Sequence, residues 1–165
     1  MRVLGVDCGS RITGYGVIDV EGSIFRYVDC GAIRPGKSDD LASRLHTIHE
    51  SLSEIIGAQK PDAAAFESVF HAANSQSALK LGHVRGVSIL AASGAAVPVF
   101  EYSALQVKSA VTGYGRAEKR QVQQMVQSLL ALETPPEPFD ASDALAVALC
   151  HAQSYRFERA TAVGK

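Results

Sequence analysis

The order of hydrophobic and polar residues along this chain predicts strands at the start and helices later. A compact apolar run at Arg2–Val6 is typical of a buried strand. The segments Tyr15–Val20 and Ile24–Ile33 also have strand character, and the short turn at Gly22 predicts that they form an antiparallel hairpin. Glycines 9, 14 and 16 are interpreted as punctuation of the first turn and the second strand.

After the hairpin, apolar residues recur in steps of three and four, which is the pattern of amphipathic helices. Two short strands, at Ala63–Glu67 and Val97–Tyr102, interrupt this pattern. Helices are expected from Asp39 or Asp40 to Gly57, from Asn74 or Ser75 to about Ser93, from Ser103 to near Gly113, from Ala117 to about Leu132, and from near Asp140 to about Phe157. This order predicts an α/β fold with a mixed five-stranded sheet flanked by helices.

Composition excludes several classes of protein. The chain has 165 residues, 47% hydrophobic and 20% charged, with a net charge of −1, so it is expected to fold as one domain rather than remain disordered. Its apolar runs are too short to span a membrane and its first residues do not resemble a signal peptide, which predicts a cytoplasmic protein. The domain is expected to cover residues 1–155, with a flexible tail at 156–165.

Four acidic residues stand out because of their surroundings. Asp7 and Glu67 each end an apolar strand, where desolvation disfavours a charge that lacks a partner. Asp140 and Asp143 are three residues apart and therefore share one face of the last helix. Clustered carboxylates repel one another, and a divalent cation removes that problem. Oxygen ligands without Cys or His favour Mg²⁺ or Mn²⁺.

Each of these acids also has a structural interpretation. Asp7 could bond the amides of the following turn, and Glu67 could pair with a buried arginine. Asp140 could cap its helix, and Asp143 could act on the helix dipole. A two-metal carboxylate site suits phosphodiester hydrolysis. The chain contains no GxSxG elbow, no phosphate loop of the GxxxxGK[ST] type and no GxGxxG after the first strand.

Five stretches of the chain resemble the RuvC family of Holliday-junction resolvases, which have the RNase H-like fold. They occur in the order and spacing of that family and extend to about residue 155. The stretches are LGVDCGSRITGYGVID at 4–19, FESVF at 66–70, NSQSALKLGHVRGV at 74–87, PVFEYSALQVKSAVTGYGRAEKRQVQ at 98–123 and DASDALAVALCHA at 140–152.

The resemblance implies a metal-binding catalytic quartet of Asp7, Glu67, Asp140 and Asp143. From the chemistry of these ligands we expect two Mg²⁺ ions per site, which Mn²⁺ can replace. The resemblance also implies a homodimer that nicks two opposed strands of a four-way DNA junction in recombination and repair, together with the RuvA and RuvB branch-migration proteins. The chain departs from the family at Cys8, where a proline is usual. Cys8 could be a thiolate ligand or an oxidation target, but a small packed side chain is the favoured interpretation.

Basic residues gather in the middle of the chain. Between Ser68 and Leu132 there are six basic residues and two acidic ones, a local charge of +4. Two bound Mg²⁺ ions would move the whole chain from −1 to +3, which favours DNA binding. Lys108 and Lys119 are assigned to phosphate contact near the scissile bond, and Phe70 to stacking on unpaired bases. The candidate DNA-binding residues are Phe70, Lys80, Arg85, Lys108, Arg116, Lys119 and Arg120.

Two other functions are kept open. The pattern D-x-G-x-x-x-x-G at Asp7, Gly9 and Gly14 also resembles the phosphate loop of the sugar-kinase and actin superfamily, although that fold needs two such lobes. A junction-binding protein that does not cleave is the other possibility. If the protein is a dimer, its interface is expected on the helix that begins near Asn74. The residues proposed for that interface are Leu81, Gly82, Val84, Gly86 and Ile89, which could equally belong to the core.

Overall fold

The computed structural model describes residues 1–37, 39–68 and 75–162, the last seven of these by their backbone alone. It contains the expected five-stranded sheet, in the order β3-β2-β1-β4-β5. The strands are β1 (Arg2–Asp7), β2 (Thr13–Glu21), β3 (Ile24–Ile33), β4 (Ala63–Ser68) and β5 (Val99–Ser103). The first three pair antiparallel, while β4 pairs parallel with both β1 and β5, so the predicted mixed sheet and hairpin are confirmed.

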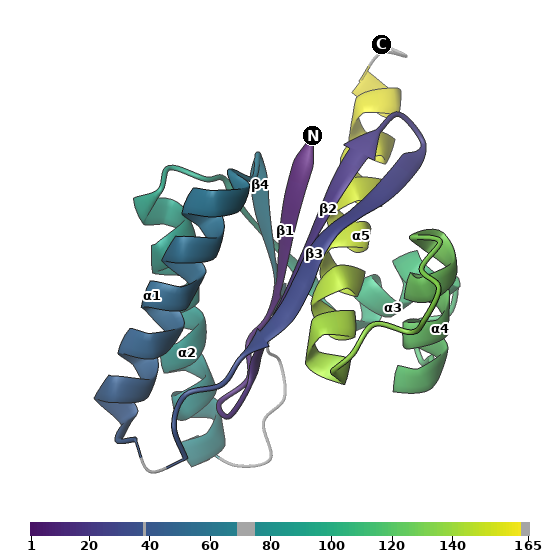
Figure 1. The fold of residues 1–165 in the computed structure, drawn as a ribbon. Helices are drawn as coiled ribbons and strands as arrows, with labels where there is room; N and C mark the ends of the chain where they lie inside the picture. Colours follow the sequence, from purple (N-terminus) through teal and green to yellow (C-terminus); the bar gives the residue numbers. More distant parts are fainter. Residues whose placement is uncertain (38, 69–74, 163–165) are drawn as a thin grey trace.

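Helices cover both faces of this sheet (Figure 1). On one face lie α1 (Leu41–Gln59) and α2 (Ser75–Gly94). On the other lie α3 (Ala104–Thr112), α4 (Lys119–Leu129) and α5 (Phe139–Ala162). Asp40 caps α1 by accepting a hydrogen bond from the Ser43 amide, and Ser103 caps α3, as the sequence predicts. No helix in the described part of the chain is long and apolar enough to cross a bilayer.

Some boundaries differ from the sequence prediction for physical reasons. Helix α4 stops at Leu129 because Ala131 takes a positive φ of 50°, which ends the helical path. Helix α5 continues past Phe157 to Ala162, since no glycine or proline interrupts the sequence before Gly164. The flexible tail proposed from residue 156 stays a prediction.

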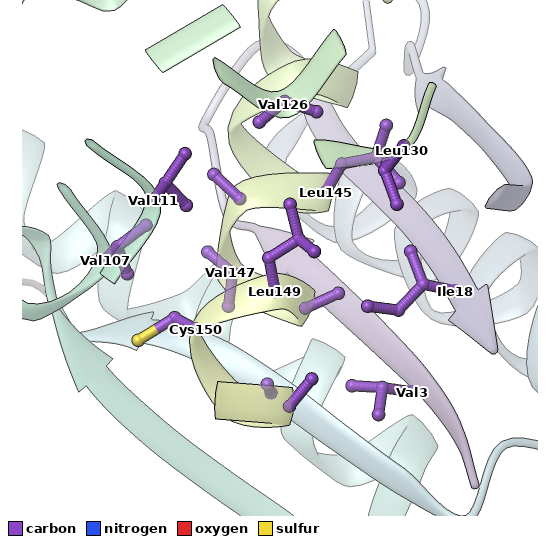
Figure 2. Packing of buried hydrophobic residues seen from close by; sticks show 14 of the residues in the cluster. Val3, Ile18, Val107, Val111, Val126, Leu130, Leu145, Val147, Leu149 and Cys150 are labelled. Carbon is purple, nitrogen blue, oxygen red and sulfur yellow. The ribbon is translucent and has the colours of Figure 1, made fainter. Parts of the chain in front are cut away.

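Helix α5 is the centre of the larger core. Its residues Leu145 and Leu149 are fully buried against Val3 and Ile18 of the sheet and against Val126 of α4 (Figure 2). The run from Ala144 to Ala152 is buried throughout. A helix buried this completely is held by packing on all sides, and its first turn is therefore fixed relative to the sheet.

Glycines allow α5 to lie unusually close to the sheet. A Cβ on Gly5 would overlap the Ala144 carbonyl oxygen, and one on Gly16 would lie 2.7 Å from the Leu145 amide nitrogen. A Cβ on Gly14 would overlap the Asp140 carbonyl oxygen. The interpretation of Gly14 as part of the first turn is corrected here, because it lies inside β2, as Gly16 does. The role of both glycines is this close approach.

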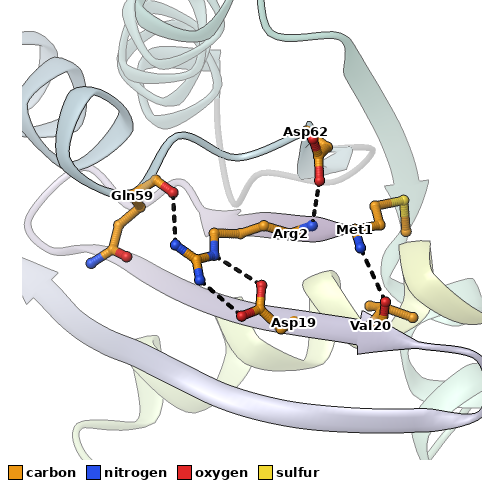
Figure 3. A network of polar contacts seen from close by, with 6 residues as sticks. All are labelled: Met1, Arg2, Asp19, Val20, Gln59 and Asp62. Carbon is orange, nitrogen blue, oxygen red and sulfur yellow. Dashed lines mark hydrogen bonds and ion pairs between the residues drawn. The ribbon is translucent and has the colours of Figure 1, made fainter.

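A polar network joins several elements at the end of the sheet where β1 begins (Figure 3). The Arg2 guanidinium donates to both carboxylate oxygens of Asp19, at 2.9 and 2.8 Å, and to the Gln59 carbonyl oxygen at 3.0 Å. The Arg2 amide donates to Asp62 at 2.6 Å. The hydrogen bond from Arg2 holds the pKa of Asp19 below its usual value. These contacts tie β1 to β2 and to the segment that follows α1.

The residues expected at a dimer interface need correction. Val84 is a core residue, 2% exposed, and Leu81 and Ile89 pack against the same core. Only Gly82 and Gly86 of the expected set are exposed. The apolar side chains that α2 presents to solvent are Leu79 and Leu90, 65% and 58% exposed.

The role of the glycines predicts a specific effect of adding one methyl group. Gly5→Ala should lower the free energy of unfolding by about 3 kcal/mol, because the new Cβ has backbone rather than a flexible side chain against it. Gly57→Ala in α1 is the control. A Cβ there meets nothing within 4 Å, so that variant should gain about 0.5–1 kcal/mol. Urea unfolding of the three proteins measures both, and equal stability of Gly5→Ala and wild type would contradict the close approach.

Candidate active site

The four predicted acids come together at one end of the sheet. Asp7 is the last residue of β1 and Glu67 is the penultimate residue of β4. These strands are parallel neighbours in the register Val6↔Phe66, so the two acids follow at the same edge. Val6 and Phe66 point into the core beneath α1 and α2. Since side chains alternate along a strand, Asp7 and Glu67 point to the face covered by α5.

The first turn of α5 supplies the other two acids. Asp140 and Asp143 belong to the start of α5, which begins at Phe139. The Asp140 backbone lies against β2 near its start, beside the end of β1. The Asp140 carbonyl closely approaches Gly14, the register partner of Asp7. The close approach of α5 to the sheet thus brings its acids toward Asp7.

The acids at this end of the sheet affect one another's ionisation. Burial is the largest of the effects that together raise the pKa of Asp7 to about 7, and the charges of Asp143, Glu67 and Asp140 add to it. Burial and the Asp143 charge also raise the pKa of Glu67. No ion pair joins Glu67 to an arginine within the described residues, so the interpretation of Glu67 as the partner of a buried arginine is not supported.

One lysine partly neutralises the group. Lys119 Nζ donates to Asp143 Oδ2 at 2.8 Å, and this hydrogen bond raises the pKa of Lys119. The charge of Lys119 also acts on Asp7 and Glu67, and Lys108 acts on Glu67. Four carboxyl groups thus face one paired ammonium, and burial raises the pKa of Asp7 because nothing there compensates its negative charge fully. The site therefore favours a further cation.

The chemistry of the donors fits a hard divalent metal. Every candidate ligand is a carboxylate oxygen, the type that Mg²⁺ and Mn²⁺ prefer. Over the described residues, no three acidic, histidine or cysteine side chains form a ready-made metal site. The fit thus rests on the donor type and on the unfavourable charge of Asp7, and one of the four acids, Asp143, is paired with Lys119.

Cys8 does not belong to the donor set. Its side chain is 7% exposed and packs in the core beneath α1 and α2, on the side of β1 away from Asp7. Burial raises the pKa of the Cys8 thiol to about 12, which disfavours the thiolate that a metal would need. The packed interpretation of Cys8 is the one that this geometry favours.

The predicted DNA contacts are dispersed around the acids. Lys108 and Lys119 act electrostatically on the carboxylates. Arg116 is exposed in the segment between α3 and α4, and Arg120 is exposed at the start of α4. Lys80 is exposed on α2. Arg85 is instead paired with Glu101 at 2.6 Å and only 23% exposed. Phe70 lies outside the described residues.

Sequence reasoning missed two basic residues near this end of the sheet. Arg11 lies in the loop between β1 and β2, and Arg44 in α1 donates to the Ser10 carbonyl oxygen of that loop. The charge count that led to the predicted DNA contacts began at Ser68, so it did not include them. Arg11 follows Asp7 by only four residues, and this short separation could have indicated that it lies near the acids.

Comparisons with known proteins show what this chain is similar to. The family model described as "Crossover junction endodeoxyribonuclease RuvC" matches residues 3–151. A protein of that name from Geobacter metallireducens is 58% identical over 93% of both chains. The solved structure of T. thermophilus RuvC in complex with Holliday junction substrate is similar with a TM-score of 0.90, at 34% identity over 96% of both chains. The yeast mitochondrial resolvase Ydc2 shares the fold, with a TM-score of 0.66 at 13% identity over 95% of this chain and 78% of its own.

The raised pKa of Asp7 predicts how the stability of the metal-free protein depends on pH. Because folding raises this pKa from 3.8 to about 7, the charged form destabilises the folded state. The stability from this group is complete below pH 3.8 and is lost as the pH rises through 7. Asp7→Asn should therefore be more stable than wild type at pH 8, by up to about 4 kcal/mol, and the difference should shrink toward pH 4.

Unfolding curves recorded in a chelator across this pH range measure the effect. Glu54→Gln, at an exposed position of α1, is the matched control and should follow wild type throughout. A constant difference between Asp7→Asn and wild type at every pH would show that the Asp7 carboxylate is not destabilised by its surroundings.

Proposed function

Because this chain belongs to the RuvC family of crossover junction endodeoxyribonucleases, we propose that it resolves four-way DNA junctions by metal-dependent nicking of two opposed strands. The observation that carries the proposal is geometric: the parallel register of β1 and β4 and the close approach of α5 bring the four acids to one end of the sheet. The similar T. thermophilus protein is described in complex with such a junction. The activity expected is that of a hydrolase that leaves 5′-phosphate and 3′-hydroxyl ends during recombination and repair.

The four acids would hold the metal. Asp7 is the natural centre, since it is coupled to the other three, and Glu67 lies on the neighbouring strand. Asp140 and Asp143 complete the set from α5, and one of them orients the attacking water. Two Mg²⁺ ions, replaceable by Mn²⁺, would supply a nucleophile at neutral pH and stabilise the charge on the leaving oxygen.

Two lysines support the chemistry from the same face. Lys119 neutralises Asp143 and is 67% exposed, so its ammonium is accessible to a DNA phosphate. Lys108 lies close enough to act on Glu67, where it could stabilise negative charge that develops on the reacting phosphate. Lys80, Arg116 and Arg120 are exposed and would contact the DNA backbone further away. Arg85 would contribute only if DNA displaced Glu101.

A homodimer would present two such sites to a junction that itself has two-fold symmetry. Leu79, Gly82, Gly86 and Leu90 follow one another in steps of three and four, so they form one exposed stripe along α2. A Cβ on either glycine would meet nothing within 4 Å, which leaves room for a helix of the second copy. We place the dimer interface on this stripe. The branch-migration proteins RuvA and RuvB as partners, and a cytoplasmic location, are part of the same proposal.

The two other functions are not favoured. A sugar-kinase or actin-type module needs a second lobe, whereas the matched family covers residues 3–151 of this chain. A junction-binding protein without cleavage would not need all four acids, and each of them is present here.

Cleavage of a synthetic four-way junction in Mg²⁺, with linear duplex as the substrate control, tests the function. Asp7→Asn should abolish cleavage, because it removes the carboxylate coupled to all the others. It should change junction affinity by less than about tenfold, because phosphate contacts dominate that affinity. Glu54→Gln should cut like wild type. A wild-type protein that cuts neither substrate, or an Asp7→Asn variant that still cuts, would refute the assignment.

The dimer interface makes a separate prediction. Leu79→Glu combined with Leu90→Glu should convert the dimer to monomers, because it places like charges on both sides of a symmetric interface. Sedimentation velocity measures the change. Ile24→Glu, at a residue that is 54% exposed at the start of β3, is the control and should leave the oligomeric state unaltered. If the α2 variant kept the same sedimentation coefficient as wild type, the interface would lie elsewhere.

A further inference from the structure

A positively charged cavity lies beside the loop that follows Asp7. It has a volume of about 250 Å³ and is formed by three parts of the chain that are distant in sequence. The β1–β2 loop supplies Ser10 and Arg11, the start of α1 supplies Arg44, and α2 supplies Lys80. We call the cavity defined by Arg11, Arg44 and Lys80 the loop pocket.

The charges of the loop pocket are not balanced. Among the described residues that line it, the one acid is Asp39, whose carboxylate accepts a hydrogen bond from the Gly36 amide at 2.7 Å. Three cations and one carboxylate give a charge of +2. In the described part of the chain, neither Arg11 nor Lys80 forms an ion pair. Both side chains are exposed, so their charges are available to an anion from solution.

The loop pocket is held in shape by the fold. Arg44 Nη2 donates to the Ser10 carbonyl oxygen, which fixes the loop against α1. Val84, which lines the pocket, belongs to the core beneath α1 and α2. The pocket therefore opens on the α1 and α2 side of the β1–β2 loop, whereas Asp7 and Glu67 point to the α5 side. One short loop separates a cationic cavity from the anionic site.

We propose that the loop pocket binds a backbone phosphate of the DNA junction, distinct from the phosphate that is cut. The proposal rests on the proposed function and adds Arg11 and Arg44 to its DNA contacts. The volume is below the ~300–1,000 Å³ of typical small-molecule sites, so the cavity fits a compact anion better than a whole nucleotide. Arginine and lysine side chains that line one cavity are the usual partners of a phosphate oxygen.

Binding of a junction in the absence of divalent metal tests this proposal. The double variant Arg11→Gln with Lys80→Gln removes the two unpaired charges and leaves Arg44 to hold the loop. Junction affinity should fall about tenfold. The slope of log affinity against log salt should become shallower by about 0.9 for each phosphate that the variant no longer neutralises. The matched control is Arg26→Gln with Lys60→Gln, which removes the same charge at the opposite end of the sheet.

The outcomes separate the loop pocket from the active site. If the Arg11→Gln/Lys80→Gln variant has the same junction affinity and salt slope as the control variant, the loop pocket is overturned. In that case, cleavage of the junction by the wild-type protein would still support the proposed function. Wild-type protein that neither binds nor cuts the junction would overturn both. Arg11→Lys with Lys80→Arg keeps the charge and should retain wild-type affinity. If the double variant fails to fold by circular dichroism, Arg11→Gln alone gives the same test, with a single charge removed.

Discussion

The contact between α5 and the first two strands is the constraint on which the candidate site depends. Side chains are missing from the sheet where the helix crosses it, at Gly5, Gly14 and Gly16, so backbone lies against backbone. Helix α5 cannot lie closer to the sheet. If it moved away from the sheet, the buried contacts around Leu145 and Leu149 would be lost. Its first turn is thus fixed beside the end of β1, and the distance between the α5 acids and Asp7 is set by packing rather than by the acids themselves.

This constraint explains why unfavourable charge persists in the folded protein. The carboxylates would separate if the backbone were free, since burial and mutual repulsion both raise the pKa of Asp7. The core keeps them together, and Lys119 offsets part of the cost. With Asp7 ionised, the folded protein is less stable than it would be with a neutral side chain at this position. Such a loss of stability is common at sites that bind a ligand of opposite charge. The same repulsion that destabilises the metal-free protein favours a divalent cation.

The sequence was informative where local pattern decides structure. Alternation, helical spacing and caps predicted all ten elements, and apolar strands that end in an acid identified Asp7 and Glu67. It was less informative where a residue's role depends on distant neighbours. Gly14 resembles a turn residue until α5 is seen against it, and Arg85 resembles a free cation until Glu101 is found beside it. The surface of α2 was misjudged because helical spacing alone does not say which side meets the core.

The loop between β1 and β2 connects two electrostatic environments of opposite sign. Asp7 faces α5, and the next residue, Cys8, turns into the core beneath α1 and α2. Proline, usual at this position in the family, would restrict the backbone. Here the buried Cys8 side chain and the hydrogen bond from Arg44 to Ser10 hold the loop instead. Because both sides of so short a loop are anchored, a phosphate in the loop pocket and a phosphate at the carboxylates would be held at a fixed separation. Binding energy from the first would then help to position the second, which is how contacts away from the reacting bond assist catalysis.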